Sequence, residues 1–447
     1  MGDGKNSKFH TKSSSLKAKW KRSPISSPVE YVNSVAISDD GSIVVAGTYF
    51  FPYAGAKHSP ADLALIKVGT FAWNAKGTSL WSDEFQATEG VYWVALSSDG
   101  RWAAGCGRTA PAEGFVYVYE VATGNRVFSF NTKVRVNMVA FSADGSYLVA
   151  GADDLYLFSR SGSTWHLAQA LACPLGDNVV AVSVSRDGQW IVAGTFRGMV
   201  YLVQNVGGIL GPPSVWQLSK GAVRWTAVSG DGSAFVVAGS DSKAHYFKTA
   251  GAGPSMAPTW SASLAGCRDC RGVAINADGS LFSAVGNNKK IGKVFLFSHQ
   301  GTSGKKLWMH ATKRNPNSTS MDGVGSYVTV ADGYPDGSPG DFYLFRGDGS
   351  SVGRLQTGNM CGHGIVTGLE VSLDGDDSAV IISPGCAITD SGEEIHVSEP
   401  LLCVLSTKVK AGFVTISFCE RCVPGVASSA GDMQECESRG RRLGAVW

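Results

Sequence analysis

An alternating pattern recurs along most of the chain: an apolar run, an Asp-Gly pair, and a second apolar run ending in Ala-Gly or a near equivalent. Examples are VNSVAISDDGSIVVAGTY (32–49), VYWVALSSDGRWAAGCGR (91–108) and VNMVAFSADGSYLVAGAD (136–153). Asp-Gly between two apolar runs predicts a β-hairpin, because glycine accepts the positive φ of a tight turn. Each copy is therefore expected to form two antiparallel strands.

The copies recur at a nearly constant interval. Seven turn glycines lie 43 to 59 residues apart: Gly41, Gly100, Gly145, Gly188, Gly232, Gly279 and Gly325. An interval near 45 residues is typical of one four-stranded propeller blade. Third strands are expected at 62–68, 114–121, 154–160, 198–204, 243–248, 292–297 and 341–346. Fourth strands are expected around Trp81, VFSF (127–130), Trp165, Trp216, Trp260 and Trp308.

The N-terminal segment 18–27 is similar to these fourth strands, with Trp20 in the tryptophan position. We expect it to pair into the seventh blade and remove the free edges of the ring, in competition with SVGRLQT at 351–357. The repeats resemble the WD40-like propeller superfamily over about residues 18–357, although they lack its Trp-Asp and Gly-His signatures. The resemblance implies a binding platform and does not identify the ligand. The predicted fold is all-β: a seven-bladed β-propeller of four-stranded blades at 18–357, followed by a small β-rich C-terminal domain at 358–447.

The segment 358–447 has alternating strands without the blade interval. It resembles a small β-domain of bacterial proteins associated with phage-tail-like contractile injection systems. The matching residues are His363, Gly364, Gly368, Leu369, Glu370, Pro384, Gly385, Ala387, Gly392, Glu394 and Ile395, then 413–419, Cys436, Ser438 and Arg439. This resemblance implies a structural or attachment role in a larger assembly. The alternative is an accessory β-domain that packs against the propeller.

Composition narrows the class of protein. Charged residues make up 17 % of the chain, and the formal net charge of +2 does not favour a nucleic-acid partner. No apolar stretch is long enough for a membrane span. Residues 1–17 are basic and polar, which predicts a disordered tail without the apolar core of a secretory signal. These features predict a cytoplasmic protein, with release or surface exposure as part of a particle as the alternative.

No catalytic residue, metal site or cofactor is predicted. The chain has no G-x-S-x-G nucleophile elbow, no HExxH and no phosphate-binding glycine loop. Two Cys-x-x-Cys pairs, Cys267/Cys270 and Cys419/Cys422, leave zinc, a disulfide and plain structural cysteines open, since one pair supplies only two of four zinc ligands. The Asp-rich turns offer too few alternating acids for calcium, and hairpin chemistry explains them more simply.

The predicted binding face gathers the loops that join strand two to strand three and strand four to the next blade. It carries aromatic and basic residues: Tyr49, Phe50, Phe51, Tyr53, Arg108, Arg135, Phe196, Arg197, Lys289, Lys290, Lys313 and Arg314. Such residues are enriched at interface hot spots. The opposite face carries mainly Asp-Gly turns, so the ring is expected to be electrically two-sided, with an acidic partner on the loop face.

The sequence therefore predicts a non-enzymatic protein-binding scaffold, a structural or attachment component of a larger, phage-tail-like assembly. Two alternatives stay open. One is a propeller enzyme that acts on carbohydrate or uses a quinone, which needs clustered carboxylates or a cofactor at the central channel. The other is a polyanion-binding protein, which would show strongly salt-dependent binding.

Overall fold

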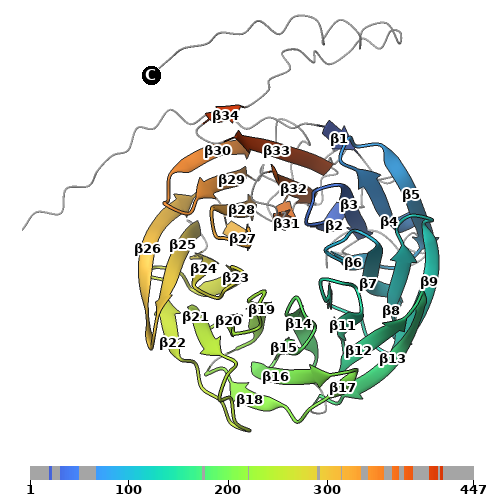
Figure 1. Ribbon diagram of the computed structural model, residues 1–447, viewed down its shortest axis with the longest axis horizontal. Coiled ribbons are helices and arrows are strands. Elements are labelled where there is room, and N and C mark those ends of the chain that lie inside the picture. The colour runs from blue at the N-terminus through green and yellow to red at the C-terminus, as the bar shows by residue number, and fades with distance from the viewer. Residues whose placement is uncertain are drawn as a thin grey trace, which may run out of the picture.

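The strands form sheets arranged as a ring (Figure 1). The computed structural model describes residues 20–22, 31–49, 67–173, 177–219, 221–288, 292–313, 315–333, 341–356, 365–371, 377–385, 402–410 and 413–415. No α-helix occurs within these ranges, and none of the described residues forms a helix long and apolar enough to span a membrane.

The first four blades run along the chain with the first strand innermost. The first blade consists of β2 (Tyr31–Ile37), β3 (Ile43–Tyr49), β4 (Lys67–Asn74) and β5 (Ser79–Gln86), and the second of β6 (Gly90–Leu96), β7 (Trp102–Ala110), β8 (Glu113–Glu120) and β9 (Asn125–Thr132). The third blade consists of β10 (Met138–Phe141), β11 (Tyr147–Gly151), β12 (Leu155–Ser161) and β13 (Thr164–Leu171). The fourth consists of β14 (Val179–Val184), β15 (Trp190–Thr195), β16 (Met199–Val206) and β18 (Ser214–Gln217). A short strand, β17 (Ile209–Leu210), extends β16 as a hairpin.

The remaining sheets continue the ring. The fifth blade consists of β19 (Val223–Val228), β20 (Ala234–Gly239), β21 (Lys243–Lys248) and β22 (Trp260–Ser263), and the sixth of β23 (Asp269–Ile275), β24 (Leu281–Asn287), β25 (Gly292–Gln300) and β26 (Ser303–Thr312). The seventh consists of β27 (Asn315–Met321), β28 (Tyr327–Gly333), β29 (Asp341–Arg346) and β30 (Ser351–Gln356). The last sheet consists of β31 (Ile365–Val371), β32 (Asp377–Gly385) and β33 (Leu402–Lys410) with β1 (Trp20–Arg22). The strand β34 (Phe413–Thr415) pairs with β33.

The all-β propeller is confirmed, and the hairpins and tryptophan-bearing outer strands lie where the repeat predicted them. One third strand differs in its bounds: in the first blade it is β4 at Lys67–Asn74, which pairs with β3, whereas residues 62–66 of the predicted strand lie outside the described residues. The long insertion before β4 obscured the strand boundary, because the apolar run continues from one segment into the next.

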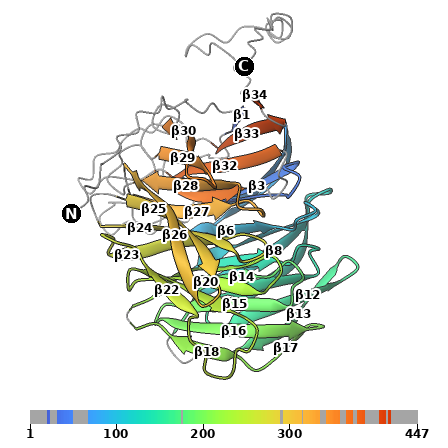
Figure 2. The same ribbon diagram turned by 60° about the vertical axis from the view of Figure 1, so that its left-hand side comes forward.

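Ring closure also differs from the expectation. The outer strand of the seventh blade is β30, which pairs with β29, whereas the N-terminal strand β1 pairs with β33. The sheet of β31, β32, β33 and β1 lies between the seventh blade and the first, where it contacts β27, β28 and β2 (Figures 1 and 2). The described strands therefore make eight blades, the first two joined into one sheet through the pair Tyr49 and Gly90, and the strands after residue 357 stand within the ring.

The hairpin turns of the first five blades repeat one set of hydrogen bonds. In the second blade, Ser97 Oγ donates to Asp99 Oδ1 at 2.6 Å, and the amide of Arg101 donates to the same carboxylate oxygen at 3.0 Å. The Ser97 hydroxyl oxygen in turn accepts from the Trp102 amide at 3.0 Å. This arrangement satisfies the backbone groups of the turn and consumes much of the carboxylate's hydrogen-bonding capacity.

The turns also bind one another from blade to blade. The amide of Asp39 donates to the carbonyl of Ser98 at 3.0 Å, that of Ser98 to Ala143 at 3.0 Å, and that of Ala143 to Arg186 at 2.8 Å. The series continues through Gly230, Ala277 and Gly323, so it joins the first seven blades. Behind the turns, the second strands are buried on both faces, which explains their continuous Val, Ala and Phe runs.

The turn glycines fit against the neighbouring blade, which gives a test of this packing. Gly232 has a φ of 70°, and a Cβ there would lie 2.6 Å from Cδ1 of Trp190 in the preceding blade. Gly162 has a φ of 62°, but a Cβ there would meet no atom within 4 Å. We expect Gly162→Ala to cost about 1 kcal/mol for the backbone conformation alone and Gly232→Ala about 3 kcal/mol. Urea unfolding followed by tryptophan fluorescence measures both; equal costs would contradict the inter-blade contact.

Four turn carboxylates, those of Asp40, Asp144, Asp231 and Asp278, have a pKa lowered by the hydrogen bonds of their own turns, and they make the stability depend on pH. Hydrogen bonds from the Ser280 hydroxyl and amide lower the pKa of Asp278 below its usual value of 3.8. A pKa that is lower in the folded than in the unfolded state adds stability above the unfolded pKa, and this stability is lost as the pH falls through the folded pKa. The urea midpoint should therefore fall as the pH is lowered from 5 to 2, and less steeply in Asp278→Asn. A steeper fall in that variant would overturn this explanation, and Ser280→Ala should lie between the two.

Candidate functional site

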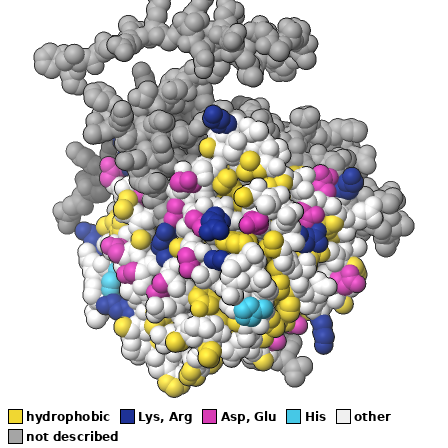
Figure 3. Space-filling model, turned by 45° about the vertical axis from the view of Figure 1, so that its right-hand side comes forward, with side chains coloured by type: hydrophobic (Ala, Val, Ile, Leu, Met, Phe, Trp, Pro, Cys, Tyr) yellow, Lys and Arg dark blue, Asp and Glu magenta, His cyan; other side chains and the backbone are white. Residues whose placement is uncertain are grey.

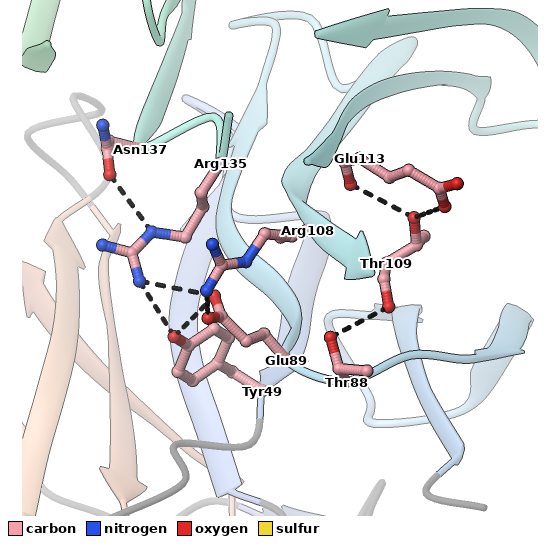
Figure 4. A network of polar contacts seen from close by, with 8 residues as sticks. All are labelled: Tyr49, Thr88, Glu89, Arg108, Thr109, Glu113, Arg135 and Asn137. Carbon is pink, nitrogen blue, oxygen red and sulfur yellow. Dashed lines mark hydrogen bonds and ion pairs between the residues drawn. The ribbon is translucent and has the colours of Figure 1, made fainter. Parts of the chain in front are cut away.

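A polar network spans the first three blades on the predicted loop face (Figure 4). Tyr49 ends β3 in the first blade, and Glu89 directly precedes β6 in the second. Arg108 lies on β7, and Arg135 lies in the connection from β9 to β10. These residues are up to 86 positions apart in the chain, and the ring geometry brings them together.

Glu89 is the centre of this network. Only 7 % of its side chain is exposed, and its carboxylate forms ion pairs with Arg108 and, at 3.4 Å, with Arg135. Tyr49 donates its hydroxyl proton to Glu89 Oε2 at 3.1 Å. A buried carboxylate needs such partners, because its desolvation is otherwise too costly. The two arginine side chains remain about one-third exposed, at 33 % and 29 %.

Arg135 is held on several sides. Its Nε donates to Asn137 Oδ1 at 3.2 Å and its Nη1 to the Tyr49 hydroxyl at 3.1 Å. Its guanidinium carbon lies 4.4 Å from the centre of the Tyr92 ring, a cation–π distance. Asn137 is fixed in turn by a 2.9 Å hydrogen bond to the carbonyl of Val179. The guanidinium is therefore oriented before any partner arrives.

The two guanidiniums also influence each other. Burial lowers the pKa of Arg108, and repulsion from the neighbouring Arg135 lowers it further. Burial raises the pKa of Tyr49, so its hydroxyl stays protonated and can donate to Glu89. The cluster of Glu89, Arg108 and Arg135 thus carries one positive charge in excess. It can attract an anion without presenting a strongly basic surface.

Of the predicted site residues, the structure brings Tyr49, Arg108 and Arg135 together. Phe196, with 64 % of its side chain exposed, and Arg197 follow β15 in the fourth blade, and Lys313 follows β26. Phe50, Phe51, Tyr53, Lys289, Lys290 and Arg314 lie outside the described residues. Glu89 and Tyr92 were missed; the only signal for Glu89 was a lone acid at the start of a repeat.

The expectation of one-signed faces is wrong. Besides Glu89, the loop face carries Asp153, Asp154 and Asp177 in the connections of the third and fourth blades. The side of the ring drawn in Figure 3 likewise shows Lys and Arg intermixed with Asp and Glu. The sequence alone does not show on which face of the ring these acids lie, because that depends on which end of a strand the loop joins.

The first cysteine pair carries no bond. Cys267 and Cys270 are both free thiols, and burial raises the pKa of Cys270 well above its usual value. The second pair, Cys419 and Cys422, lies outside the described residues. Within the described ranges, no group of three or more His, Cys, Asp or Glu side chains is arranged to hold a metal ion.

A second polar chain lies at the fifth blade. His245 contacts Asp241 Oδ2 through Nε2 at 3.0 Å and the Ser261 hydroxyl through Nδ1 at 2.8 Å. The order resembles a hydrolytic triad, but the His245 side chain is only 4 % exposed and its ring centre lies 4.7 Å from that of Trp216. Both ring nitrogens are occupied, so the chain ties the turn before β21 to the outer strand β22.

Large side chains meet at the centre of the ring and leave a cavity beside them. The inner strands line a cavity of about 310 Å³, and Trp93 of the second blade meets Trp225 of the fifth edge-to-face at 5.1 Å. On the side of the Asp-Gly turns, Arg186 bridges to Asp39 at 2.7 Å. A propeller that acts on carbohydrate or uses a quinone was expected to gather carboxylates at the channel. The described residues that line this cavity include no Asp or Glu.

The buried carboxylate makes the network testable by mutation. Arg108→Met removes one partner of Glu89, and we expect a loss of about 2 kcal/mol, since the largely buried carboxylate then keeps Arg135, at 3.4 Å, as its remaining ion-pair partner. Glu89→Gln combined with Arg108→Met should recover part of that loss, because no buried charge remains. Urea unfolding of the wild type, both single variants and the double variant measures the coupling. If the losses of stability in the two single variants added up to the loss in the double variant, the pair of Glu89 and Arg108 would contribute nothing to stability.

The comparisons with known proteins agree with this architecture. The family model of the WD domain, G-beta repeat, matches residues 124–157. Actin-interacting protein 1 of Caenorhabditis elegans is 25 % identical over 201 residues, which is 44 % of this chain and 30 % of that protein. The chain thus aligns with less than one-third of this curated relative.

Solved structures are similar in fold. Chaetomium thermophilum Sqt1 bound to the N-terminus of the ribosomal protein L10 superposes with a TM-score of 0.63 and 11 % identity, covering 87 % of this chain and 99 % of that one. The Cps50 (Swd1) propeller domain of Myceliophteria thermophila gives a TM-score of 0.51 and 12 % identity over 71 % and 96 % of the two chains. At such identities the likeness shows the fold alone. The chain is therefore a β-propeller, and its residues 124–157 match the model of the WD40 repeat.

Proposed function

We propose that the protein is a non-enzymatic scaffold that binds a partner protein on the loop face of its first three blades. The observation that carries this proposal is the pair of part-exposed arginines fixed around buried Glu89. A side chain that is already oriented loses little conformational entropy on binding, and arginines with aromatic support are typical of interface hot spots.

The fold and the similar proteins support the same class of function. WD40 propellers typically act as protein-interaction scaffolds, and Sqt1, whose fold is similar, was solved with the N-terminus of a ribosomal protein bound. The phage-tail-like assembly that the C-terminal resemblance implies has no support among these proteins, which come from eukaryotes. The proposal therefore stops at a partner protein, and a cytoplasmic site of action stays a prediction of the sequence.

The site separates this proposal from a polyanion-binding role. A polyanion binder needs several uncompensated cations along one surface. Here one of the two positive charges is neutralised by Glu89, and acids occur on the neighbouring loops. The arrangement suits a local, shaped contact with a protein better than a long charged track.

Quantitative affinity capture with the intact chain tests this function. Truncation after Gln356 is unsuitable, because it removes β31 to β33 and thereby the partner strand of β1. We expect proteins captured by the wild type to be lost with Arg135→Ala and retained with Arg101→Ala, a matched exposed arginine beside an Asp-Gly turn on the opposite face. Mass spectrometry with isotopic labels gives the ratios. Loss with Arg101→Ala and retention with Arg135→Ala would place the interface on the other face.

A further inference from the structure

We propose that Arg108 and Arg135 jointly bind one carboxylate of an acidic segment in the partner protein. This inference deepens the proposed function and rests on it. It specifies the chemistry of the contact: a monoanionic Asp or Glu side chain, rather than a phosphorylated residue or an apolar anchor.

Unused donors make the first argument. Each guanidinium has five N–H donors in a planar fork. Arg135 uses Nε and Nη1, and Arg108 uses Nη2 toward Glu89. No described residue accepts from Arg135 Nη2 or Arg108 Nη1. A carboxylate is the acceptor that matches such forks.

The charge of the cluster makes the second argument. Two guanidiniums and one buried carboxylate leave a single positive charge, which one Asp or Glu side chain neutralises. A phosphate group carries close to two negative charges at neutral pH and would lie near the Glu89 carboxylate, which repels it. The buried acid therefore selects a monoanion.

Rigid support makes the third argument. The Tyr92 ring lies against the Arg135 guanidinium at 4.4 Å and meets the Tyr49 ring edge-to-face at 5.2 Å. Asn137 and Tyr49 fix two edges of the same guanidinium. The fork is held in one plane, so its open edge faces a partner in a single orientation, which favours bidentate capture of a planar carboxylate.

Glu113 provides an internal control. It begins β8, directly after the loop from β7, and in Figure 4 it lies beside Thr109 and apart from Arg135. It is exposed and accepts from the Thr109 hydroxyl at 3.3 Å rather than from an arginine. Removing its charge changes the net charge of the face as much as removing that of Glu89. It does not change the charge between the two guanidiniums.

The experiment selects random dodecapeptides displayed on phage against the full chain. The best peptide is then resynthesised with its acids intact, with Asp and Glu replaced by Asn and Gln, and with phosphoserine in their place. Binding is measured by fluorescence anisotropy. We expect acid-bearing peptides to be selected, and Arg135→Met to weaken their binding about 10-fold or more through loss of a charge-assisted hydrogen bond.

The Glu89→Gln variant gives the sharper outcome. Removing the buried negative charge should strengthen binding of the acidic peptide severalfold. It should also reduce the difference in affinity between the acidic and the phosphoserine peptides. Glu113→Gln should change neither affinity. Peptides that bind equally well with Asn and Gln, or that prefer phosphoserine on the wild type, would overturn the carboxylate inference and leave the scaffold function standing. If no peptide binds the loop face and Arg135→Ala captures the same proteins as the wild type, both proposals fail.

Discussion

The ring depends on the hydrogen bonds that pass from one Asp-Gly turn to the next. The amide of Asp39 donates to Ser98, Ser98 to Ala143, and the series continues to Gly323 in the seventh blade. Each bond links hairpins that are about one repeat apart in the chain, so the turn has two roles at once: it reverses a strand and it fixes the neighbouring blade. The turn glycine is required for both, because a Cβ at Gly145 would lie 2.7 Å from Trp102 in the preceding blade.

Because of this constraint, the two faces of the propeller differ in how many polar groups remain available to a ligand. On the turn face, the central aspartate of each of the first six turns accepts hydrogen bonds from a Ser hydroxyl and a backbone amide of its own turn, as Asp99 does, so it has little capacity left for a ligand. On the opposite face the connections carry no such obligation and vary in length and residue type. The cluster of Glu89, Arg108 and Arg135 formed there without disturbing the repeat.

Closure of the ring follows from the same repeat. The first strand pair of the sheet after residue 357 shifts register between Val366 and Gly368, as the seventh blade does between Pro316 and Ser318. In the sequence, Asp374-Gly375 follows Gly325 by 50 residues, which is one more repeat interval. That signal was available, but the later glycine- and proline-containing pattern suggested a separate domain. The strand β1 completes this sheet, so the chain closes the ring with its N-terminal part.

The sequence by itself determined the local structure: the hairpins, their interval, the outer tryptophan strands and the arginines and tyrosine of the loop face. These follow from near-neighbour chemistry, since an Asp-Gly pair or an apolar run acts within a few residues. Only the tertiary structure decided which strand fills each outer place, how many sheets complete the ring, and that Glu89 lies between Arg108 and Arg135. Those outcomes depend on which distant segments meet, and burial of a charge beside its partner is a property of the assembled blades rather than of any single repeat.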